Sequence, residues 1–512
     1  MIEVPAAEVI VTGRWVVCDP RSGVAPDNAL AVAGGKIVAT GARDALCRVH
    51  PEAILAGGDD VAVLPGFVNT HHHGFGIGSV LRGVPDQALE PWIIEMGAAP
   101  ALPADLAARL TGAALLRSGV TTLVDMCGAA GPFDLFPEKV RASIRGYRSV
   151  GLRTIVAPGI RLQNLLAQAD GEDALLLPAL PRQSRETADE ILDRVRPCVS
   201  DYIDCIRGLI AETRSDPQTD VWFGPPGPQW VGIDGFTEIA AAAKDLETRL
   251  QTHALESFAE RLEGPRSLGR SRISALAAAG ALSSRLSIAH AVWASDADLD
   301  LMAQHGVSVS HSASSNLRLR AGIAPLPAFL SRGLTVGIGL DGTSLADDDD
   351  MFAEMRLATN LQRVETLGGS GCDLRPTFDL ATRGGAELVG YPGELGELTV
   401  GANADLSLIS LDRILWPWAD PEADPLDLIL SRAVARDVRD VMIDGIWRLK
   451  DGVHCDLNLE DAGREAAEYL AANVPAPARR EAARALALAV HIWHKDWAHS
   501  NLTPHSAYNS RT

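Results

Sequence analysis

The sequence lacks both long hydrophobic segments and a cysteine framework. No apolar run reaches the roughly 18 uncharged residues of a membrane-spanning helix, so we expect no membrane partner. The seven cysteines are widely spaced and form no CxxC pair, which argues against a disulfide scaffold and favours a reducing compartment. The opening segment, MIEVPAAEVIVTG, does not have the basic and then apolar layout of a signal peptide. These absences predict a cytoplasmic protein.

Positive charge is also scarce in this sequence. Lysine and arginine total 46 against 66 acidic residues, which gives a net charge of −20, and only five of the basic residues are lysines. A chain this acidic repels phosphate backbones, so we expect no nucleic-acid partner. The 512 residues are 47% apolar, which is enough for a large buried core and for more than one structural unit.

The middle of the chain, residues 65–392, alternates strand-like and helix-like segments. Eight apolar runs are typical of buried parallel strands, and amphipathic stretches such as 105–119 and 188–210 lie between them. Eight such units predict an α/β fold, a (β/α)₈ barrel of the TIM type, with a doubly wound open sheet as the alternative. The runs cover residues 61–73, 121–126, 153–159, 221–225, 249–255, 286–292, 306–312 and 335–341.

The two ends of the chain have a different pattern from the middle. Residues 1–64 contain short Val- and Ile-rich strands broken by Gly and Asn, and residues 393–456 repeat this pattern. We expect these two pieces to pair into one small composite β-sandwich domain. Residues 457–512 form a predicted helical tail, in which 482–497 is the clearest helix.

Side chains that can bind a metal stand at the ends of four of the eight runs. Active sites of barrel enzymes gather at the carboxyl ends of the strands. Side chains two apart on a strand point the same way, so His71 and His73 can face one ion while His72 points elsewhere. Three imidazoles and a carboxylate suit one divalent ion, Zn²⁺ first and Fe²⁺, Co²⁺ or Mn²⁺ as alternatives. The strand-end residues are His71 and His73, then His253, His290 and Asp341.

An HxH pair alone is more typical of a surface or of ordinary packing. Here it coincides with His253, with Glu256 three positions further on, and with His290 and Asp341, each at a strand end. Scattered polar residues would rarely fall on four strand ends, so the joint pattern favours a metal site.

Several motifs together resemble the amidohydrolase superfamily. They are PGFVNTHHH, THALE, IAHAVW, SHSASSNLRLRAGIAP and GIGLDGTSLADDDDMFAEMRLA, and the resemblance covers residues 5 to about 450. The most similar branch holds cytosine deaminase, methylthioadenosine/S-adenosylhomocysteine deaminase and the triazine hydrolases. The resemblance implies a (β/α)₈ barrel with a composite β-sandwich from both termini.

The resemblance also implies residue roles. His71, His73, His253 and Asp341 match the metal ligands, Glu256 matches the acid/base carboxylate, and His290 matches the histidine beside the attacking water. Asp341 would then take a proton from that water, and the reaction would replace an amino group on a heterocycle and release ammonia. Many relatives bridge two metals with a carboxylated lysine on strand four, but the fourth run, VWFGPPGPQW, has no lysine. One metal ion is therefore expected.

Four further residues are candidates for substrate contacts, each with a structural alternative. Trp92 resembles a pocket tryptophan of relatives or is a hydrophobic anchor, and Gln229 contacts an amide-like ring edge or packs after strand four. His311 and His72 line the pocket or make ordinary core hydrogen bonds. The acidic run 347–350 is expected to cap a helix rather than bind a second metal. The Leu- and Ala-rich segment 159–186 is a candidate lid.

The sequence leaves the substrate open. Adenosine-type relatives carry a histidine after strand four and an acidic residue nine positions after the pocket tryptophan, where this chain has GPPGP and Ala101. A free heterocycle of the pyrimidine, purine or triazine type is therefore favoured over a nucleoside. The alternatives are removal of chloride or alkylamine from a triazine, hydrolysis of an amide, urea or carbamate, and a barrel that binds without catalysis. A homo-oligomer is expected by analogy only.

Overall fold

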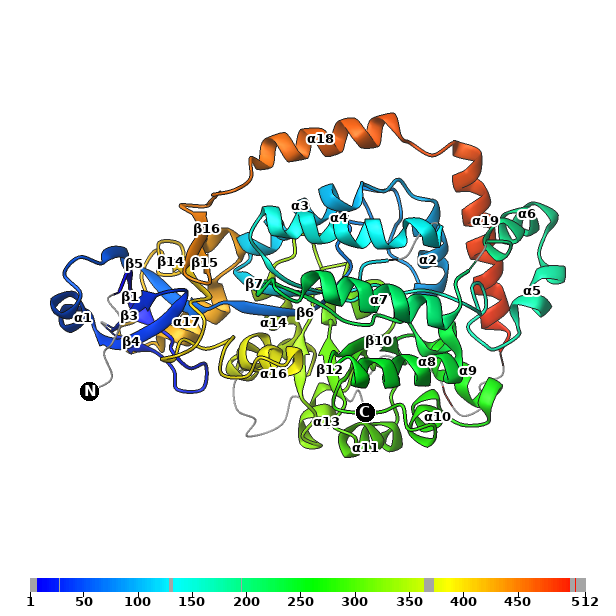
Figure 1. Cartoon of the computed structure of the whole chain (residues 1–512), viewed down its shortest axis with the longest axis horizontal. Coiled ribbons are helices and arrows are strands. Elements are labelled where there is room, and N and C mark those ends of the chain that lie inside the picture. Colours follow the sequence, from blue (N-terminus) through cyan, green and yellow to red (C-terminus); the bar gives the residue numbers. More distant parts are fainter. Residues whose placement is uncertain are drawn as a thin grey trace, which may run out of the picture.

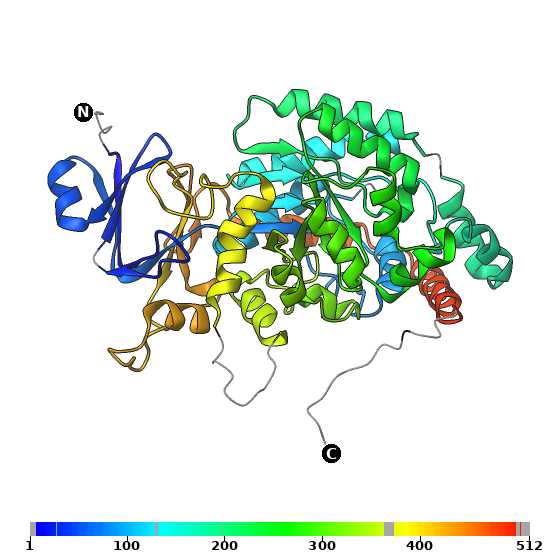
Figure 2. The same ribbon diagram turned by 90° about the horizontal axis from the view of Figure 1, so that it is seen from below.

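A computed structural model of the protein describes residues 7–26, 28–128, 132–194, 196–362, 373–497 and 502. The β-rich N-terminal region forms one end of the molecule, and helices surround parallel strands in the larger remaining part (Figures 1 and 2). Within the predicted helical tail, residues 498–501 and 503–512 lie outside the described residues. No helix in the described part is long and apolar enough to cross a bilayer.

Eight parallel strands occupy the described middle of the chain, and each overlaps one predicted run, although the fourth, Thr219–Val221, shares only Val221 with the run 221–225. Their residues are buried throughout except Asp220, which explains the near-continuous apolar runs. One four-stranded sheet contains β6 (Phe67–His72), β7 (Val120–Asp125), β8 (Arg153–Val156) and β9 (Thr219–Val221). The other contains β10 (Leu250–Ala254), β11 (Leu286–His290), β12 (Ser308–His311) and β13 (Val336–Ile338).

Backbone hydrogen bonds link the two sheets at both of their edges. Beyond β9, Phe223 forms a parallel bridge with Leu250 of β10, and the Gln251 amide donates to the Phe223 carbonyl at 2.9 Å. Beyond β13, the Asp341 amide donates to the His71 carbonyl of β6 at 2.9 Å. The first and last strands of the set therefore lie next to each other.

Helices between the strands cover the two sheets. The apolar faces of most of these helices and strands share one large buried cluster, while smaller clusters hold those of α2, α9 and α16. Asp350 accepts hydrogen bonds from the Phe352 and Ala353 amides at the start of α14, which confirms that the acidic run caps a helix. The helices are α2 (Leu89–Ala98), α3 (Ala104–Arg117), α4 (Phe136–Ser149), α7 (Val199–Thr213), α8 (Pro228–Asp245), α9 (Phe258–Leu268), α10 (Arg272–Ala278), α11 (Asp296–Gln304), α12 (Ala313–Arg318), α13 (Leu326–Ser331), α14 (Met351–Leu361), α15 (Arg375–Asp379) and α16 (Gly385–Val389).

The two ends of the chain pair into one mixed sheet, as the sequence predicted. Its strand order is β17-β16-β15-β14-β5-β1-β3-β4, with β2 paired to β1. The junction is antiparallel, with Leu64 of β5 opposite Ser407 of β14. The strands are β1 (Val9–Val16), β2 (Ala25–Pro26), β3 (Asn28–Ala33), β4 (Lys36–Ala42), β5 (Ile54–Pro65), β14 (Leu406–Ser410), β15 (Val438–Ile443), β16 (Ile446–Lys450) and β17 (Val453–His454), accompanied by α1 (Arg43–Val49) and α17 (Pro425–Arg432).

The C-terminal tail returns from this sheet to the opposite end of the molecule. Helix α18 (Leu459–Ala472) runs along the outside, and α19 (Pro477–Lys495) packs beside α2 and against α5 (Asp173–Ala179) and α6 (Arg182–Leu192), as Figure 1 shows. Leu166 and Leu176 of the Leu-rich segment share a buried cluster with Leu486 and Val490 of α19. The apolar composition of segment 159–186 therefore reflects its contact with this tail.

Candidate active site

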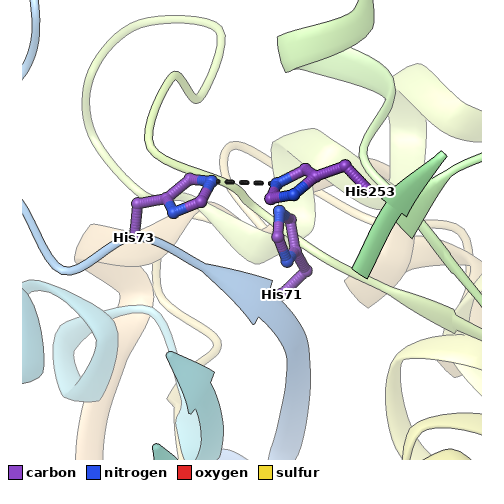
Figure 3. A group of neighbouring side chains, drawn as sticks. All are labelled: His71, His73 and His253. Carbon is purple, nitrogen blue, oxygen red and sulfur yellow. Dashed lines mark hydrogen bonds between the residues drawn. The ribbon is translucent and has the colours of Figure 1, made fainter. Parts of the chain in front are cut away.

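Three histidine side chains converge where β6 and β10 end. His71 lies on β6, His73 follows that strand directly, and His253 lies on β10. The Nε2 atoms of His73 and His253 are 3.2 Å apart, and the His71 ring lies below them (Figure 3). One ligand nitrogen from each ring lies within 4.8 Å of the others. The predicted strand-end positions therefore place these three rings in one cluster.

The outward nitrogen of each ring is held by an oxygen that can only accept. His71 Nδ1 donates to Gln251 Oε1 at 2.9 Å. His73 Nδ1 donates to the Met126 carbonyl at 2.9 Å, and His253 Nδ1 donates to the Pro226 carbonyl at 2.6 Å. The three Nε2 lone pairs therefore point inward, and the buried His71 Nε2 has no hydrogen-bond partner. Burial lowers the pKa of His71 to about 3, so its ring stays neutral. This donor set fits a divalent cation.

Asp341 supplies a carboxylate to the same cluster. It follows β13, and its Oδ1 lies 3.3 Å from His73 Nε2 and 3.7 Å from His71 Nε2. Its Oδ2 accepts a hydrogen bond from the Ser315 hydroxyl at 2.6 Å. Burial by itself would raise the pKa of Asp341, but the neighbouring histidines and Ser315 lower it well below its usual value. The carboxylate is therefore charged at neutral pH and available to a cation or a proton.

His290 lies between Asp341 and Glu256. Its Nε2 is 3.7 Å from Asp341 Oδ2 and 3.6 Å from Glu256 Oε2, while its Nδ1 donates to Asn316 Oδ1 at 2.9 Å. His290 and Asp341 both have positive φ values, 75° and 55°, a strained conformation that is concentrated at functional sites. The two strand ends therefore hold these side chains at a cost in backbone strain.

Glu256 follows β10 and is buried, and its Oε1 has no hydrogen-bond partner. Burial, followed by the nearby Glu260, Asp341 and Glu90 carboxylates, raises the pKa of Glu256 well above its usual value. The raised pKa of Glu256 favours the protonated form of its carboxyl. The carboxyl is therefore suited to donate that proton to a substrate.

Two of the four predicted substrate residues lie beside this cluster. The Trp92 ring is 6.3 Å from Phe75, which in turn stacks on His73 at 5.6 Å, and the buried Trp92 Nε1 has no hydrogen-bond partner. His311, at the end of β12, is buried with neither ring nitrogen bonded. Burial and then His290 lower the pKa of His311 to about 4. Both side chains therefore have free polar atoms near the cluster.

The other two predicted substrate residues are bonded to the protein. Gln229 Nε2 donates to Gln168 Oε1 at 3.1 Å and to Glu260 Oε1 at 3.2 Å. His72 Nδ1 accepts from the Gly74 amide at 2.9 Å, and its Nε2 lies 3.4 Å from Asp349. His72 therefore has its partners in a network outside the cluster, as its position between His71 and His73 predicted.

The supporting residues Gln251, Asn316, Ser315 and Glu260 were missed by sequence reasoning. Gln251 had a signal, because it lies two positions before His253 and so shares its face of β10. Asn316 lies in the SHSASSN part of a quoted motif, and its side chain accepts from His290. No local pattern marks Ser315, which contacts Asp341 26 residues away, whereas Glu260 had a signal in its place four positions after Glu256.

No lysine ends any of the eight parallel strands. The five lysines lie on β4, α4, α8, β16 and α19. None can supply the bridging carbamate that two-metal relatives use, as the sequence indicated. The six cysteines in the described residues are free, and Cys372 lies outside those residues.

The fold combines parallel strands with a histidine-rich cluster at their carboxyl ends that can hold a metal ion. The amidohydrolase family model matches residues 62–448, and the chain belongs to this family. It is 29% identical over 454 residues to a 5-methylthioadenosine/S-adenosylhomocysteine deaminase of Nitratidesulfovibrio vulgaris, covering 87% of this chain and 93% of that protein.

Solved structures share the fold. An adenosine deaminase from Xanthomonas campestris with bound zinc has a TM-score of 0.73 at 24% identity, covering 90% of this chain and 98% of that one. Atrazine chlorohydrolase TrzN from Arthrobacter aurescens, complexed with zinc, has a TM-score of 0.72 at 22% identity, covering 90% and 100%. At these identities the likeness shows the fold alone.

Proposed function

We propose that the protein is a metal-dependent hydrolytic deaminase that releases ammonia from an aromatic N-heterocycle of the pyrimidine, purine or triazine type. The observation that carries this proposal is the meeting of Glu256, His290 and Asp341 beside the three converging imidazoles. A buried acid, a neutral histidine and a charged carboxylate in one cluster are the groups that hydrolysis of an amino-substituted ring needs. The deaminase name of a relative along most of the chain supports the same reaction.

The scaffold we propose is a closed (β/α)₈ barrel with a composite β-sandwich. The edge-to-edge bonds Phe223–Leu250 and Asp341–His71 support closure of the two parallel sheets. We propose the barrel for residues 65–392, the sandwich for 1–64 with 393–456, and a helical tail for 457–512. A cytoplasmic location and a homo-oligomer stay predictions.

One divalent ion, Zn²⁺ first, is the proposed cofactor, held by His71, His73, His253 and Asp341. The inward-facing Nε2 atoms and the Asp341 carboxylate support this assignment, as does the zinc in two proteins of the same fold. Such an ion lowers the pKa of a bound water from about 15.7 towards 7. Fe²⁺, Co²⁺ and Mn²⁺ suit the same ligands.

The side chains around this position move protons and orient the reactants. Asp341, charged and close to His290, accepts a proton from the attacking water. His290 is neutral and donates from Nδ1 to Asn316, so its Nε2 accepts a hydrogen bond from that water and orients it. Glu256, whose raised pKa favours the protonated form, donates to a ring nitrogen and then helps the amino group to leave as ammonia.

The substrate ring is proposed to lie between Trp92 and His311, since both have unbonded polar atoms near the cluster. Gln229 and His72 have protein partners for their polar atoms, which supports positioning roles for them rather than direct contact with the ring. Ala101, at the position where adenosine-type relatives carry an acidic residue, favours a free heterocycle over a nucleoside.

A substrate panel tests the proposed reaction. Purified protein with Zn²⁺ is offered cytosine, adenine, adenosine, 5′-methylthioadenosine, an aminotriazine and a chlorotriazine, and released ammonia and chloride are measured. Ammonia from at least one aminated ring, lost on chelation and restored by Zn²⁺, is the expected result. Chloride release alone, or no product from any ring, would contradict deamination.

A further inference from the structure

The C-terminal helix α19 is connected to Glu256 by a series of buried hydrogen bonds. We propose that Glu260, Gln229 and Gln168 form a positioning relay through which α19 holds Glu256 in place. The proposal rests on the function proposed above for Glu256. It assigns Gln229 to positioning rather than substrate contact, and it gives the tail a part in the active site.

The first half of the relay fixes the backbone of Glu256. The Glu256 amide donates to Glu260 Oε2 at 2.7 Å, and the other oxygen of Glu260 accepts from Gln229 Nε2 at 3.2 Å. Glu256, Glu260 and Gln229 are all buried. Leu255, directly before Glu256, has φ of 53°, a strained conformation that persists only where the surroundings hold it. The relay therefore supports the turn that presents Glu256.

The second half connects Gln229 to the tail. Gln229 Nε2 donates to Gln168 Oε1 at 3.1 Å, and the Gln168 amide donates to His494 Nε2 on α19 at 3.3 Å. Trp493 Nε1 on the same helix donates to Glu172 at 3.0 Å. Segment 159–186 is therefore the connector between α19 and Gln229, and its apolar residues fix that connector against the helix.

Helix α19 and Trp497, which follows it, also contact the elements on either side of Glu256. Trp497 packs with Ala259, the second residue of α9, and with Ala169 of the connector. Arg484 lies 3.7 Å from Glu95 of α2, whose Glu90 accepts a hydrogen bond from Ser257. The tail thus contacts the connector, α2 and α9, the three segments that adjoin the acid. The contacts to the connector and to α2 are polar, which a helix with only a packing role would not need.

Two histidines on α19 provide a matched pair for the test. His494→Phe keeps a ring beside Trp497, whose centroid is 4.7 Å from the His494 ring, but removes the acceptor for the Gln168 amide. His491→Phe changes an exposed histidine one turn earlier on the same helix. His494→Gln, which restores an acceptor oxygen, is the rescue variant.

The test measures amide hydrogen exchange in residues 255–260, and kcat and KM for ammonia release from the panel substrate that the wild type turns over fastest. We expect His494→Phe to speed exchange in this segment and to lower kcat about tenfold, with KM and bound zinc unchanged, since groups that orient catalytic residues are typically worth 10- to 100-fold. His491→Phe should match wild type, and His494→Gln should recover most of the loss. Unchanged exchange in His494→Phe would overturn the relay, and this arm gives an answer even if no panel substrate is deaminated.

A double-variant cycle separates a relay from unrelated packing effects. Gln168→Leu and Gln229→Leu each break the series of hydrogen bonds. In the double variant, amide exchange in residues 255–260 should therefore be no faster than in Gln229→Leu alone, and kcat should be no lower. Independent structural defects would instead multiply. Multiplicative losses in the double variant would contradict the relay.

Discussion

The metal cluster and the acid Glu256 are held in different ways, although both stand at the carboxyl end of β10. The rings of His71, His73 and His253 are fixed by acceptors on or directly after parallel strands. Glu256 is instead held by side chains from α8, α9 and the connector, and through them by the tail. The proposed ligands are therefore preorganised at the strand ends. The proposed acid instead depends on Glu260, four residues away, and through it on segments distant in sequence.

The largest effect is expected where the strand-built cluster loses a ligand. His253→Ala removes one of the three converging nitrogens, so we expect bound zinc and ammonia release to fall to background. Metal analysis of the purified variant, together with its turnover, checks this outcome. Full zinc occupancy in His253→Ala would remove His253 from the ligand set.

The next variant should lower turnover without affecting metal binding. Glu256→Gln keeps the size of the side chain but removes the donated proton, so turnover should fall by about 10²–10⁴ while zinc stays bound. Parallel measurements of kcat and metal content test this. Turnover within about tenfold of wild type would exclude Glu256 as the proton donor.

A side-chain amide behind a metal ligand should affect metal binding before rate. Gln251→Leu removes the acceptor for His71 Nδ1, so zinc affinity should weaken by about 10- to 100-fold, with kcat near wild type once zinc is saturating. Competition with a zinc chelator measures the affinity. An unchanged affinity would mean that the strand alone orients His71.

The smallest effect is expected from the matching amide behind His290. Asn316→Leu removes the acceptor for His290 Nδ1, so kcat should fall about tenfold and zinc affinity should stay unchanged. Steady-state kinetics at saturating zinc, with the same chelator competition, separates the two quantities. A loss of zinc affinity in this variant would place His290 among the ligands. Asn316 and Gln251 would then both support metal binding, which would contradict the predicted difference between them.

The strand-built half of the site was predictable from the sequence because it follows local rules. A strand of period two puts His71 and His73 on one face, and parallel strands bring their carboxyl ends together, so the ligands could be chosen from eight apolar runs. The pairing of the two chain ends also followed from their shared strand pattern. These features need only local periodicity and strand direction.

The loop-built half was not predictable beyond the local Glu256–Glu260 contact, because the contacts that connect this pair to the tail join segments far apart in the chain. Gln168 and His494 are 326 residues apart, and Gln229 and Gln168 are 61 apart. Segment 159–186 was expected to be a lid, and the structure packs its leucines against α19. A leucine-rich composition predicts that a segment is buried against another part of the protein, but it does not indicate which part.

The most direct test of the central claim is to locate the metal. Crystals of zinc-loaded protein are measured at the zinc absorption edge, so that anomalous scattering marks each ion. The account predicts one peak per chain, about 2.0–2.2 Å from Nε2 of His71, His73 and His253 and from an Asp341 oxygen. A second peak of equal height in the site, or a single peak away from these four side chains, would contradict it.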